Sequence, residues 1–293
     1  MAPVQADIAA RPAESASARG AARWRDLRQR GASAAVLIPC ALVCVWLGGP
    51  VFAVLVVLAV VGLAWEWAAL CGAASAAWTR GIVIVAATVP VVLAAVGETP
   101  AGLVAVPVAA AAAALLARRT ESVPARRAEQ AFGVIYVAVP AIALLWLRAD
   151  AGAGLANLLF LLGAVWVADS GAYVAGRALG GPKLASVISP GKTWSGAIGG
   201  VVAAAVFGGI TAALDPLAVA WWYAVVLAAG IAVIGQAGDL FESRLKRHFG
   251  VKDSGRLIPG HGGLLDRLDA LLAVAPVAAV LALALGPGVV LWR

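Results

Sequence analysis

Two aspartates three residues apart, Asp266 and Asp269, stand at the start of a long apolar stretch near the end of the chain. On a helix, residues at i and i+3 share a face, so both carboxylates point the same way. Two neighbouring carboxylates repel each other unless a cation lies between them, and such oxygen ligands suit Mg²⁺. Acids are also favoured as caps at helix N-termini, although one Asp would satisfy that alternative. We interpret the pair as a metal site.

A second polar group precedes this pair on the segment from Gly238 to Phe249, which continues an apolar stretch. Its polar residues recur at helical spacing and therefore share one face. They are Asp239, Glu242, Ser243, Lys246 and Arg247. The alternative is a solvated helix face, on which a pair such as Glu242–Lys246 contributes about 0.2–0.5 kcal/mol.

The segment between these groups, Lys252–Gly263, is rich in glycine. Glycine lets backbone amides approach and surround phosphate oxygens, although ordinary turns use the same residues. The segment also carries charged and imidazole side chains, which favours phosphate binding. These are Lys252, Asp253, Arg256 and His261.

Three further charges lie elsewhere in the chain. Asp169 falls deep within an apolar stretch, where a carboxylate is costly and normally faces a cavity or a partner. Gly191-Lys192-Thr193 is similar to the end of a nucleotide-binding P-loop, but Ser186 replaces the earlier glycine and excludes that motif. Lys192 stays a candidate phosphate contact. Glu66 lies between two tryptophans near a helix end, and we expect it to reach the membrane interface.

The elements that position these residues follow from composition. The chain has 293 residues, of which 63% are hydrophobic and only 13% charged, whereas about a quarter of a soluble domain is charged. Apolar stretches of about 17–25 residues are long enough to span a bilayer, and about nine recur along the chain. They are Ala32–Leu47, Val51–Leu70, Gly81–Gly97, Ala101–Ala117, Ala131–Leu147, Leu155–Ala175, Ala197–Leu214, Leu217–Gln236 and Ala270–Leu285. We predict an all-α, polytopic integral membrane protein whose single catalytic domain covers residues 32–293.

The cations predict the orientation of this domain, because cytoplasmic loops accumulate Lys and Arg. With the N-terminus inside and the C-terminus outside, every Lys and Arg except Arg148 and Arg293 falls in a cytoplasmic segment. The net charge of +7 is then explained by anionic lipid head groups rather than by nucleic acid. Residues 1–31 lack a signal-peptide pattern and are expected to form a disordered cytoplasmic tail.

A longer motif joins the three polar groups. It reads Ser243-x-x-Lys246-Arg247, then Lys252-Asp253, then Pro259-Gly260-His261-Gly262-Gly263-x-x-Asp266-Arg267-x-Asp269. This motif resembles the signature of the phosphatidate cytidylyltransferase (CDP-diacylglycerol synthase) family. Asp169–Arg177 and Ser189–Gly196 also resemble family segments, although Ser195 stands where a glutamate is expected.

The resemblance implies that CTP and phosphatidic acid react to give CDP-diacylglycerol and diphosphate in phospholipid biosynthesis. It also implies a divalent metal, a helical membrane fold and a homodimer. The orientation predicted from the cations then places the active site at the cytoplasmic face of the plasma membrane.

Combined with the residue patterns, the resemblance assigns roles. The expected metal ligands are Asp239, Asp266 and Asp269, with Mg²⁺ as the cofactor and a second cation as an open alternative. The expected catalytic residues are Ser243, Lys246, Arg247, Lys252, Asp253, His261 and Arg267; His261 either bonds phosphate or orders the loop. The expected substrate-binding residues are Asp169, Lys192, Gly260, Gly262 and Gly263.

Two other functions remain open at this point. A CTP-dependent polyprenol kinase would transfer the γ-phosphate to a lipid alcohol and release CDP. A membrane transporter would use Asp169 and Glu66 as intramembrane coupling charges, but it would leave the extramembrane motif unexplained.

Overall fold

The computed structural model describes residues 35–72, 77–117, 124–218, 220–255, 257–258 and 262–293. Within these ranges, eight helices are long and apolar enough to cross a membrane, and a shorter apolar helix, Ala35–Leu47, precedes them. The prediction of an all-α polytopic membrane fold is therefore confirmed. The proposed tail, residues 1–31, lies outside the described residues, and the N-in, C-out orientation stays a prediction.

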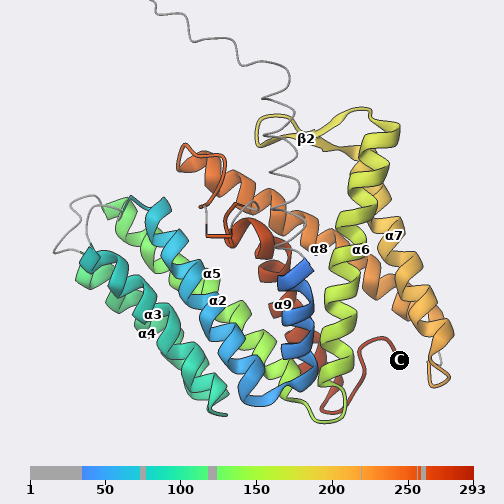
Figure 1. Ribbon diagram of the computed structural model, residues 1–293, viewed down its shortest axis with the longest axis horizontal. Coiled ribbons are helices and arrows are strands. Elements are labelled where there is room, and N and C mark those ends of the chain that lie inside the picture. Colours follow the sequence, from blue (N-terminus) through green and yellow to red (C-terminus); the bar gives the residue numbers. More distant parts are fainter. Residues whose placement is uncertain (1–34, 73–76, 118–123, 219, 256, 259–261) are drawn as a thin grey trace, which may run out of the picture.

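The helices form one bundle (Figure 1). In chain order the elements are α2 (Gly49–Leu70), α3 (Ala77–Ala95), α4 (Thr99–Ala117), α5 (Pro124–Ala149), α6 (Gly154–Leu179), β1 (Lys183–Ala185), β2 (Ser189–Thr193), α7 (Trp194–Leu214), α8 (Trp221–His248) and α9 (Leu265–Leu285).

Three helices are clearly longer than a bilayer requires. With 26 residues in α5 and in α6 and 28 in α8, each exceeds the roughly 20 residues that span the hydrocarbon core. At about 1.5 Å per residue, α8 is about 42 Å long. Its final turns carry the predicted polar face, and the start of α9 lies against them, so this end of the bundle concentrates the charges.

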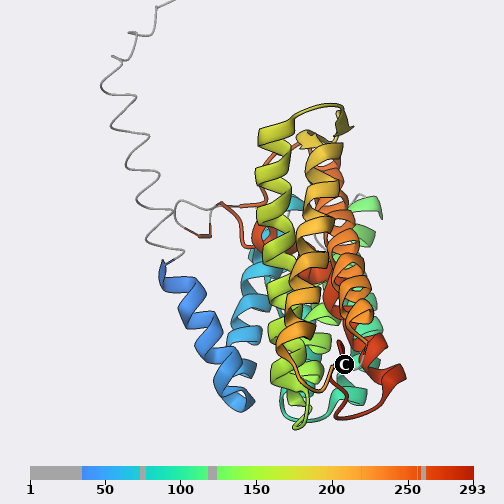
Figure 2. The same ribbon diagram turned by 90° about the vertical axis from the view of Figure 1, so that its right-hand side faces the viewer.

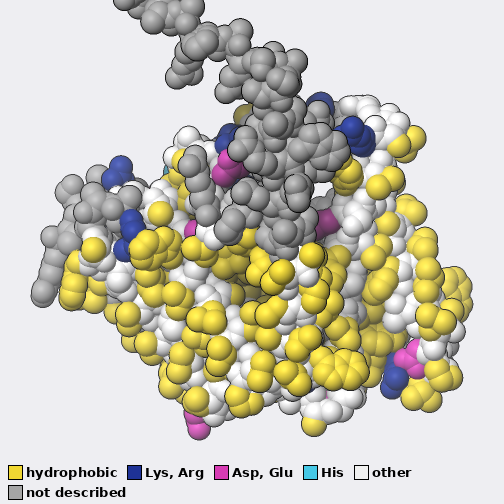
Figure 3. All heavy atoms as spheres, in the orientation of Figure 1, with side chains coloured by type: hydrophobic (Ala, Val, Ile, Leu, Met, Phe, Trp, Pro, Cys, Tyr) yellow, Lys and Arg dark blue, Asp and Glu magenta, His cyan; other side chains and the backbone are white. Residues whose placement is uncertain are grey.

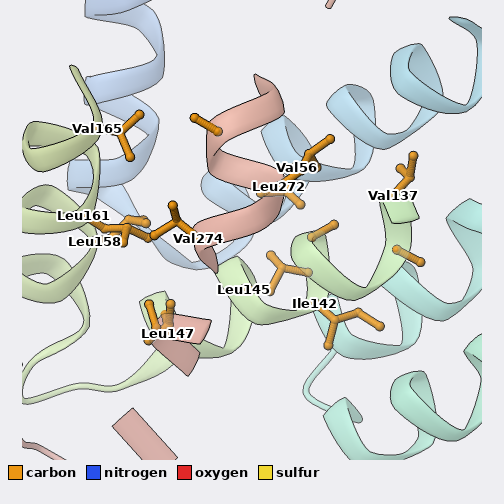
Figure 4. Close-up of a cluster of buried hydrophobic side chains, with 14 of the residues drawn as sticks. Val56, Val137, Ile142, Leu145, Leu147, Leu158, Leu161, Val165, Leu272 and Val274 are labelled. Atoms are coloured by element: carbon orange, nitrogen blue, oxygen red, sulfur yellow. The ribbon is translucent and has the colours of Figure 1, made fainter. Parts of the chain in front are cut away.

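The bundle core lies where α2, α5, α6 and α9 meet (Figure 4). Val56 of α2, Leu145 of α5, Leu161 of α6 and Val274 of α9 point into this shared interior, and all four are buried. Helices that pack in lipid gain from close van der Waals contact rather than from the exclusion of water. The long apolar side chains of these four helices therefore build a rigid frame beneath the charged end.

Small residues bring α6, α7 and α8 together. A Cβ on Gly200 of α7 would lie 2.8 Å from the Ala168 carbonyl oxygen of α6, and one on Gly208 would collide with the Ala224 carbonyl of α8. Glycine at these positions lets the backbones approach, as is typical of membrane helix pairs. The contact fixes α6, which carries Asp169, relative to α8, which carries Asp239.

A small hairpin, which the sequence pattern did not predict, follows α6. Strands β1 and β2 pair antiparallel, with Lys183 opposite Thr193 and Ala185 opposite Ser189. Thr193 then caps α7, because its Oγ1 accepts a hydrogen bond of 3.1 Å from the Gly196 amide. The hairpin therefore holds Lys192 one residue before a helix N-terminus.

The C-terminal residues after α9 form a strap across the opposite end of the bundle. Asp150 Oδ2 accepts a 2.6 Å hydrogen bond from the Gly288 amide, and the Asn157 side chain bonds Val289 and Leu291 at 3.0 and 2.7 Å. The N–H groups of Gly288, Ala153 and Gly152 lower the pKa of Asp150.

The strap should loosen in acid. A carboxylate with a lowered pKa stabilises the fold above its unfolded pKa of about 3.9, and that contribution is lost as the pH falls through the folded pKa. At neutral pH, Asp150→Ala should reproduce the loosening and speed hydrogen exchange of the Gly288 amide. The Leu291 amide, bonded by Asn157, is the internal control. Unchanged exchange at Gly288 would contradict this role.

Candidate active site

Three carboxylates converge where α8 meets the start of α9. Asp239 and Glu242 of α8 and Asp269 of α9 each offer an oxygen, and these oxygens lie within 4.8 Å of one another. The Glu242 side chain is fully buried, and its Oε1 has no hydrogen-bond partner among the described residues. A buried, unpaired carboxylate oxygen beside two further acids is costly unless a cation balances it. The donor set therefore fits a hard divalent cation.

The cluster differs from the predicted ligand set in one member. Asp239 and Asp269, two of the predicted ligands, lie in it, whereas Glu242 was assigned no metal role and was named only in the alternative of a solvated helix face. The signal was present in the sequence, because Asp239 and Glu242 are spaced i and i+3 on the polar face of one helix. The ligand roles of Asp239, Asp266 and Asp269 stay predictions.

Lys246 ties the two helices together. Its ammonium nitrogen lies 2.7 Å from Glu242 Oε2 and 2.6 Å from Asp266 Oδ1, and its side chain is mostly buried. A partly buried ammonium between two carboxylates offsets part of their repulsion. Lys246 thus positions α8 against α9 in this structure, and its predicted phosphate contact stays a prediction.

Asp266 also organises the glycine-rich segment. Its Oδ2 accepts hydrogen bonds from the Ser254 and Gly263 amides, each 3.1 Å long. These two residues lie on either side of the central part of the segment, so one carboxylate holds its two ends together. Asp266 therefore connects the glycine-rich segment to Lys246 and, through Lys246, to the carboxylate cluster.

Glu66 of α2 holds the same segment from a distant part of the sequence. Its side chain is 2% exposed, and its two oxygens accept from the Leu264 amide at 2.9 Å and the Leu265 amide at 2.8 Å. These are among the otherwise unpaired amides at the start of α9, so Glu66 caps that helix from outside. The expectation that Glu66 reaches the membrane interface is wrong, because its carboxylate is buried against the start of α9 and binds amides there.

Close packing around Glu66 explains two of the glycines. A Cβ on Gly255 would lie 2.5 Å from Glu66 Oε1, and one on Gly263 would lie 2.9 Å from Glu66 Oε2. Either contact would displace the carboxylate from the amides that it binds. Two glycines of the glycine-rich segment are thus required for packing against Glu66, in addition to the phosphate contact that the sequence suggests for the segment.

Lys192 and Asp169 approach the cluster from the hairpin and from α6. Lys192 forms an ion pair with Asp239. Asp169 is within electrostatic range of both Asp239 and Lys192, and it also lines an apolar cavity together with Arg267. Residues from α6, β2, α8 and α9 therefore meet at one place, and the substrate-binding roles predicted for Asp169 and Lys192 stay predictions.

The other predicted site residues lie around this centre. Ser243 is half-buried on α8, while Lys252 and Asp253 are exposed in the segment that follows it. Arg247 is exposed, and its Nε donates a 3.3 Å hydrogen bond to the Ile188 carbonyl of the hairpin turn.

The glycine-rich turn is described only in part. Gly262 has a positive φ of 84°, and its carbonyl accepts a hydrogen bond of 3.0 Å from the Ile258 amide. Pro259, Gly260 and His261 lie outside the described residues, and the roles predicted for Gly260 and His261 stay predictions.

Ser195, the departure from the family pattern, has a structural role here. Its hydroxyl donates a hydrogen bond to the Gly180 carbonyl and lies 3.0 Å from Thr193 Oγ1. It therefore ties the start of α7 to the end of α6 and supports the hairpin that presents Lys192.

Comparison with known proteins agrees with this arrangement. A sequence model described as the cytidylyltransferase family matches residues 28–285. A phosphatidate cytidylyltransferase of Brucella suis is 53% identical over 145 residues, which cover 50% of this chain and 53% of that protein. One of Staphylococcus saprophyticus is 40% identical over 153 residues, which cover 52% and 59%. The chain thus spans about half the length of the curated relatives it matches. Because the family match extends over most of the sequence, the chain belongs to the cytidylyltransferase family.

Proposed function

We propose that the protein is a phosphatidate cytidylyltransferase, which converts CTP and phosphatidic acid into CDP-diacylglycerol and diphosphate. The observation that carries the proposal is the cluster of Asp239, Glu242 and Asp269, with its unpartnered buried oxygen, within electrostatic range of Asp169, which lines an apolar cavity. Such a site suits a reaction between a metal-bound nucleotide and a lipid phosphate. The family match and the names of the relatives support the same reaction.

In this reaction an oxygen of the lipid phosphate forms a bond to the α-phosphorus of CTP. The bond from that phosphorus to the oxygen bridging it to the β-phosphorus breaks, and diphosphate leaves. The lipid phosphate is already anionic at neutral pH, so the protein need not supply a general base. Positioning and charge neutralisation are the main requirements of phosphoryl-type transfers.

The carboxylate cluster and the cations around it meet these requirements. A divalent cation, Mg²⁺ in our proposal, would be held by Asp239, Glu242 and Asp269 and would neutralise charge on the phosphate oxygens. Cationic side chains around the cluster orient the nucleotide and the lipid phosphate. These are Lys192, Arg247, Lys252 and Arg267, with hydrogen bonds added by Ser243, His261 and the amides of Gly260, Gly262 and Gly263.

The proposed location is the cytoplasmic side of the plasma membrane. The Lys and Arg side chains visible in Figure 3 gather mainly towards the end of the molecule that carries the β1–β2 hairpin. Cytoplasmic segments accumulate such residues, and CTP is a cytoplasmic metabolite while phosphatidic acid is held in the bilayer. A homodimer is part of the proposal on the family resemblance alone.

Lys192→Ala should lower kcat/KM for CTP by about 10–100-fold, because one charge-assisted contact to phosphate is lost. The effect should fall mainly on KM, since the carboxylate cluster remains in place. Lys183→Ala is the matched control, because Lys183 is exposed on the other strand of the same hairpin. Equal kinetics for the two variants would contradict the role of Lys192.

The proposed reaction is tested with the purified full chain in detergent micelles supplied with CTP, phosphatidic acid and Mg²⁺. CDP-diacylglycerol and diphosphate should form in equal amounts. CDP release with phosphorylation of an added polyprenol would identify the kinase instead. Solute flux across sealed vesicles without any chemical product would identify a transporter.

A further inference from the structure

An apolar cavity of about 490 Å³ lies between the Ala35–Leu47 helix and α2, α5, α6 and α9. Among the described residues that line it, only Asp169 and Arg267 are charged. Both of these charged residues belong to the proposed active site. The cavity therefore has an apolar lining, and its charged end belongs to the site where the phosphates are expected to react.

The inner wall of the cavity belongs to the rigid core. Val56 of α2, Val137 of α5 and Leu272 of α9 line it, and the same side chains are buried between those helices. Leu158 and Val165 of α6 complete the lining, and Figure 4 shows Val56 and Leu272 where α2 meets α9. A wall built from packed core side chains keeps its shape without a ligand, which is typical of binding cavities.

The outer wall is the Ala35–Leu47 helix, which lies at the edge of the bundle (dark blue in Figure 2). Leu37, Ala41 and Val45 line the cavity from one side of this helix. Val43 and Trp46 are 55% and 68% exposed. Both faces of the helix are therefore apolar. This is expected of a helix that has an apolar cavity on one side and the lipid bilayer on the other.

The outer wall is anchored at one end. Arg148 of α5 donates hydrogen bonds of 2.6 and 2.9 Å to the carbonyls of Val45 and Trp46, which are the orphan acceptors of the helix C-terminus. Gly48 and Gly49, both with positive φ, then turn the chain into α2. A side chain at Gly48 would collide with the Arg148 guanidinium. The anchor therefore fixes the lower end of the wall, away from the carboxylate cluster.

From these observations, and resting on the proposed function, we propose that this cavity binds an acyl chain of the phosphatidic acid substrate beneath the Ala35–Leu47 helix. The lipid phosphate then lies beside Arg267 and faces the carboxylate cluster. The occupant must combine a hydrocarbon tail with an anionic head, because the lining combines an apolar body with an arginine at its active-site end. The volume is within the range of about 300–1,000 Å³ found for ligand cavities.

Filling the cavity should make the enzyme lose its preference for long chains. Ala59→Trp from α2 and Ala41→Phe from the outer wall both place a ring in the cavity. For each variant, the ratio of kcat/KM for dioleoyl over dihexanoyl phosphatidic acid should fall by about tenfold or more, because a few excluded methylenes suffice for that effect. The activity on the dihexanoyl substrate should stay close to that of the wild type.

Leu58→Trp and Val43→Phe are the matched controls. They add the same rings to the same two helices at positions that face outward and are 63% and 55% exposed. Neither should alter the chain-length ratio. An unchanged ratio in both cavity variants, or an equal loss of activity on both substrates, would overturn the proposal.

A labelling experiment separates this proposal from the proposed function. Dioleoyl-type phosphatidic acid that carries a diazirine near the end of one chain is photolysed with the wild-type protein, without CTP. Labels should appear on cavity residues such as Leu55 and Leu162, and excess unlabelled phosphatidic acid should remove them. Labels that phosphatidylcholine removes equally well would show a general lipid site and overturn the proposal. Failure of the proposed reaction would instead appear as absence of CDP-diacylglycerol with either substrate.

Discussion

Asp269→Asn is expected to lower the kcat for CDP-diacylglycerol formation by about 10³-fold while the protein keeps its fold. Asn keeps the size of the side chain and removes the negative charge, so the cluster keeps two carboxylates where three converge in the native protein. Loss of one electrostatic contact in a preorganised site lowers kcat by about 10²–10³-fold. Loss of a metal ligand also weakens charge stabilisation in the chemical step, so it should lower kcat in the same way. The measurement is the initial rate of product formation at saturating CTP and phosphatidic acid.

The matched control is Asp150→Asn, which makes the same change at the opposite end of the bundle, where Asp150 binds the C-terminal strap. It should retain nearly the activity of the native protein. If Asp269→Asn also stayed within about tenfold of the native rate, the role of the cluster would be refuted.

Glu66→Ala is expected to have the largest effect of any change outside the carboxylate cluster. It leaves the half-buried Leu264 amide and the buried Leu265 amide without acceptors, and a buried unsatisfied group costs about 1–3 kcal/mol. The variant should therefore lose about 2–4 kcal/mol of stability, since the two amides share one cap. Turnover should fall as well, because the displaced α9 start carries Asp266 and Asp269. Thermal inactivation and hydrogen exchange at the start of α9 measure the two effects.

Two further variants make this result specific. Glu66→Gln keeps one acceptor oxygen and the size of the side chain, so it should fall between the native protein and Glu66→Ala in both measurements. Glu98→Ala removes an exposed glutamate between α3 and α4 and should have little effect. Native-like exchange at the start of α9 in Glu66→Ala would contradict the capping role.

The helices were predictable because each is long and apolar. In lipid, every backbone N–H and C=O group of a span must form a hydrogen bond within the protein. An apolar stretch of sufficient length therefore has few alternatives to a helix. The continuation of α8 beyond its apolar part, to His248, was also predictable, because the polar residues of Gly238–Phe249 recur at helical spacing. The β1–β2 hairpin was missed because Lys183–Ala185 and Ser189–Thr193 are short and lack the alternation of buried strands.

The site was predictable where its residues share one helix and less so where distant segments meet. Helical spacing alone places Asp239, Glu242 and Lys246 on one face of α8. Glu66 was misinterpreted because its partners lie 198 and 199 residues away, and no spacing rule links positions so far apart. The choice between Glu242 and Asp266 as the third acid of the cluster likewise depends on how α8 and α9 face each other.

The most direct test of the central claim is a change of metal preference in Asp269→Cys. A thiolate ligand favours soft ions such as Cd²⁺ over Mg²⁺, which prefers oxygen. The native protein serves as the control for Cd²⁺ binding at Cys40, Cys44 and Cys71, which are free thiols. If Asp269 binds the metal at which nucleotide and lipid react, the variant will be inactive with Mg²⁺ and will recover CDP-diacylglycerol formation with Cd²⁺. Full activity with Mg²⁺, or no recovery with Cd²⁺, would contradict the account.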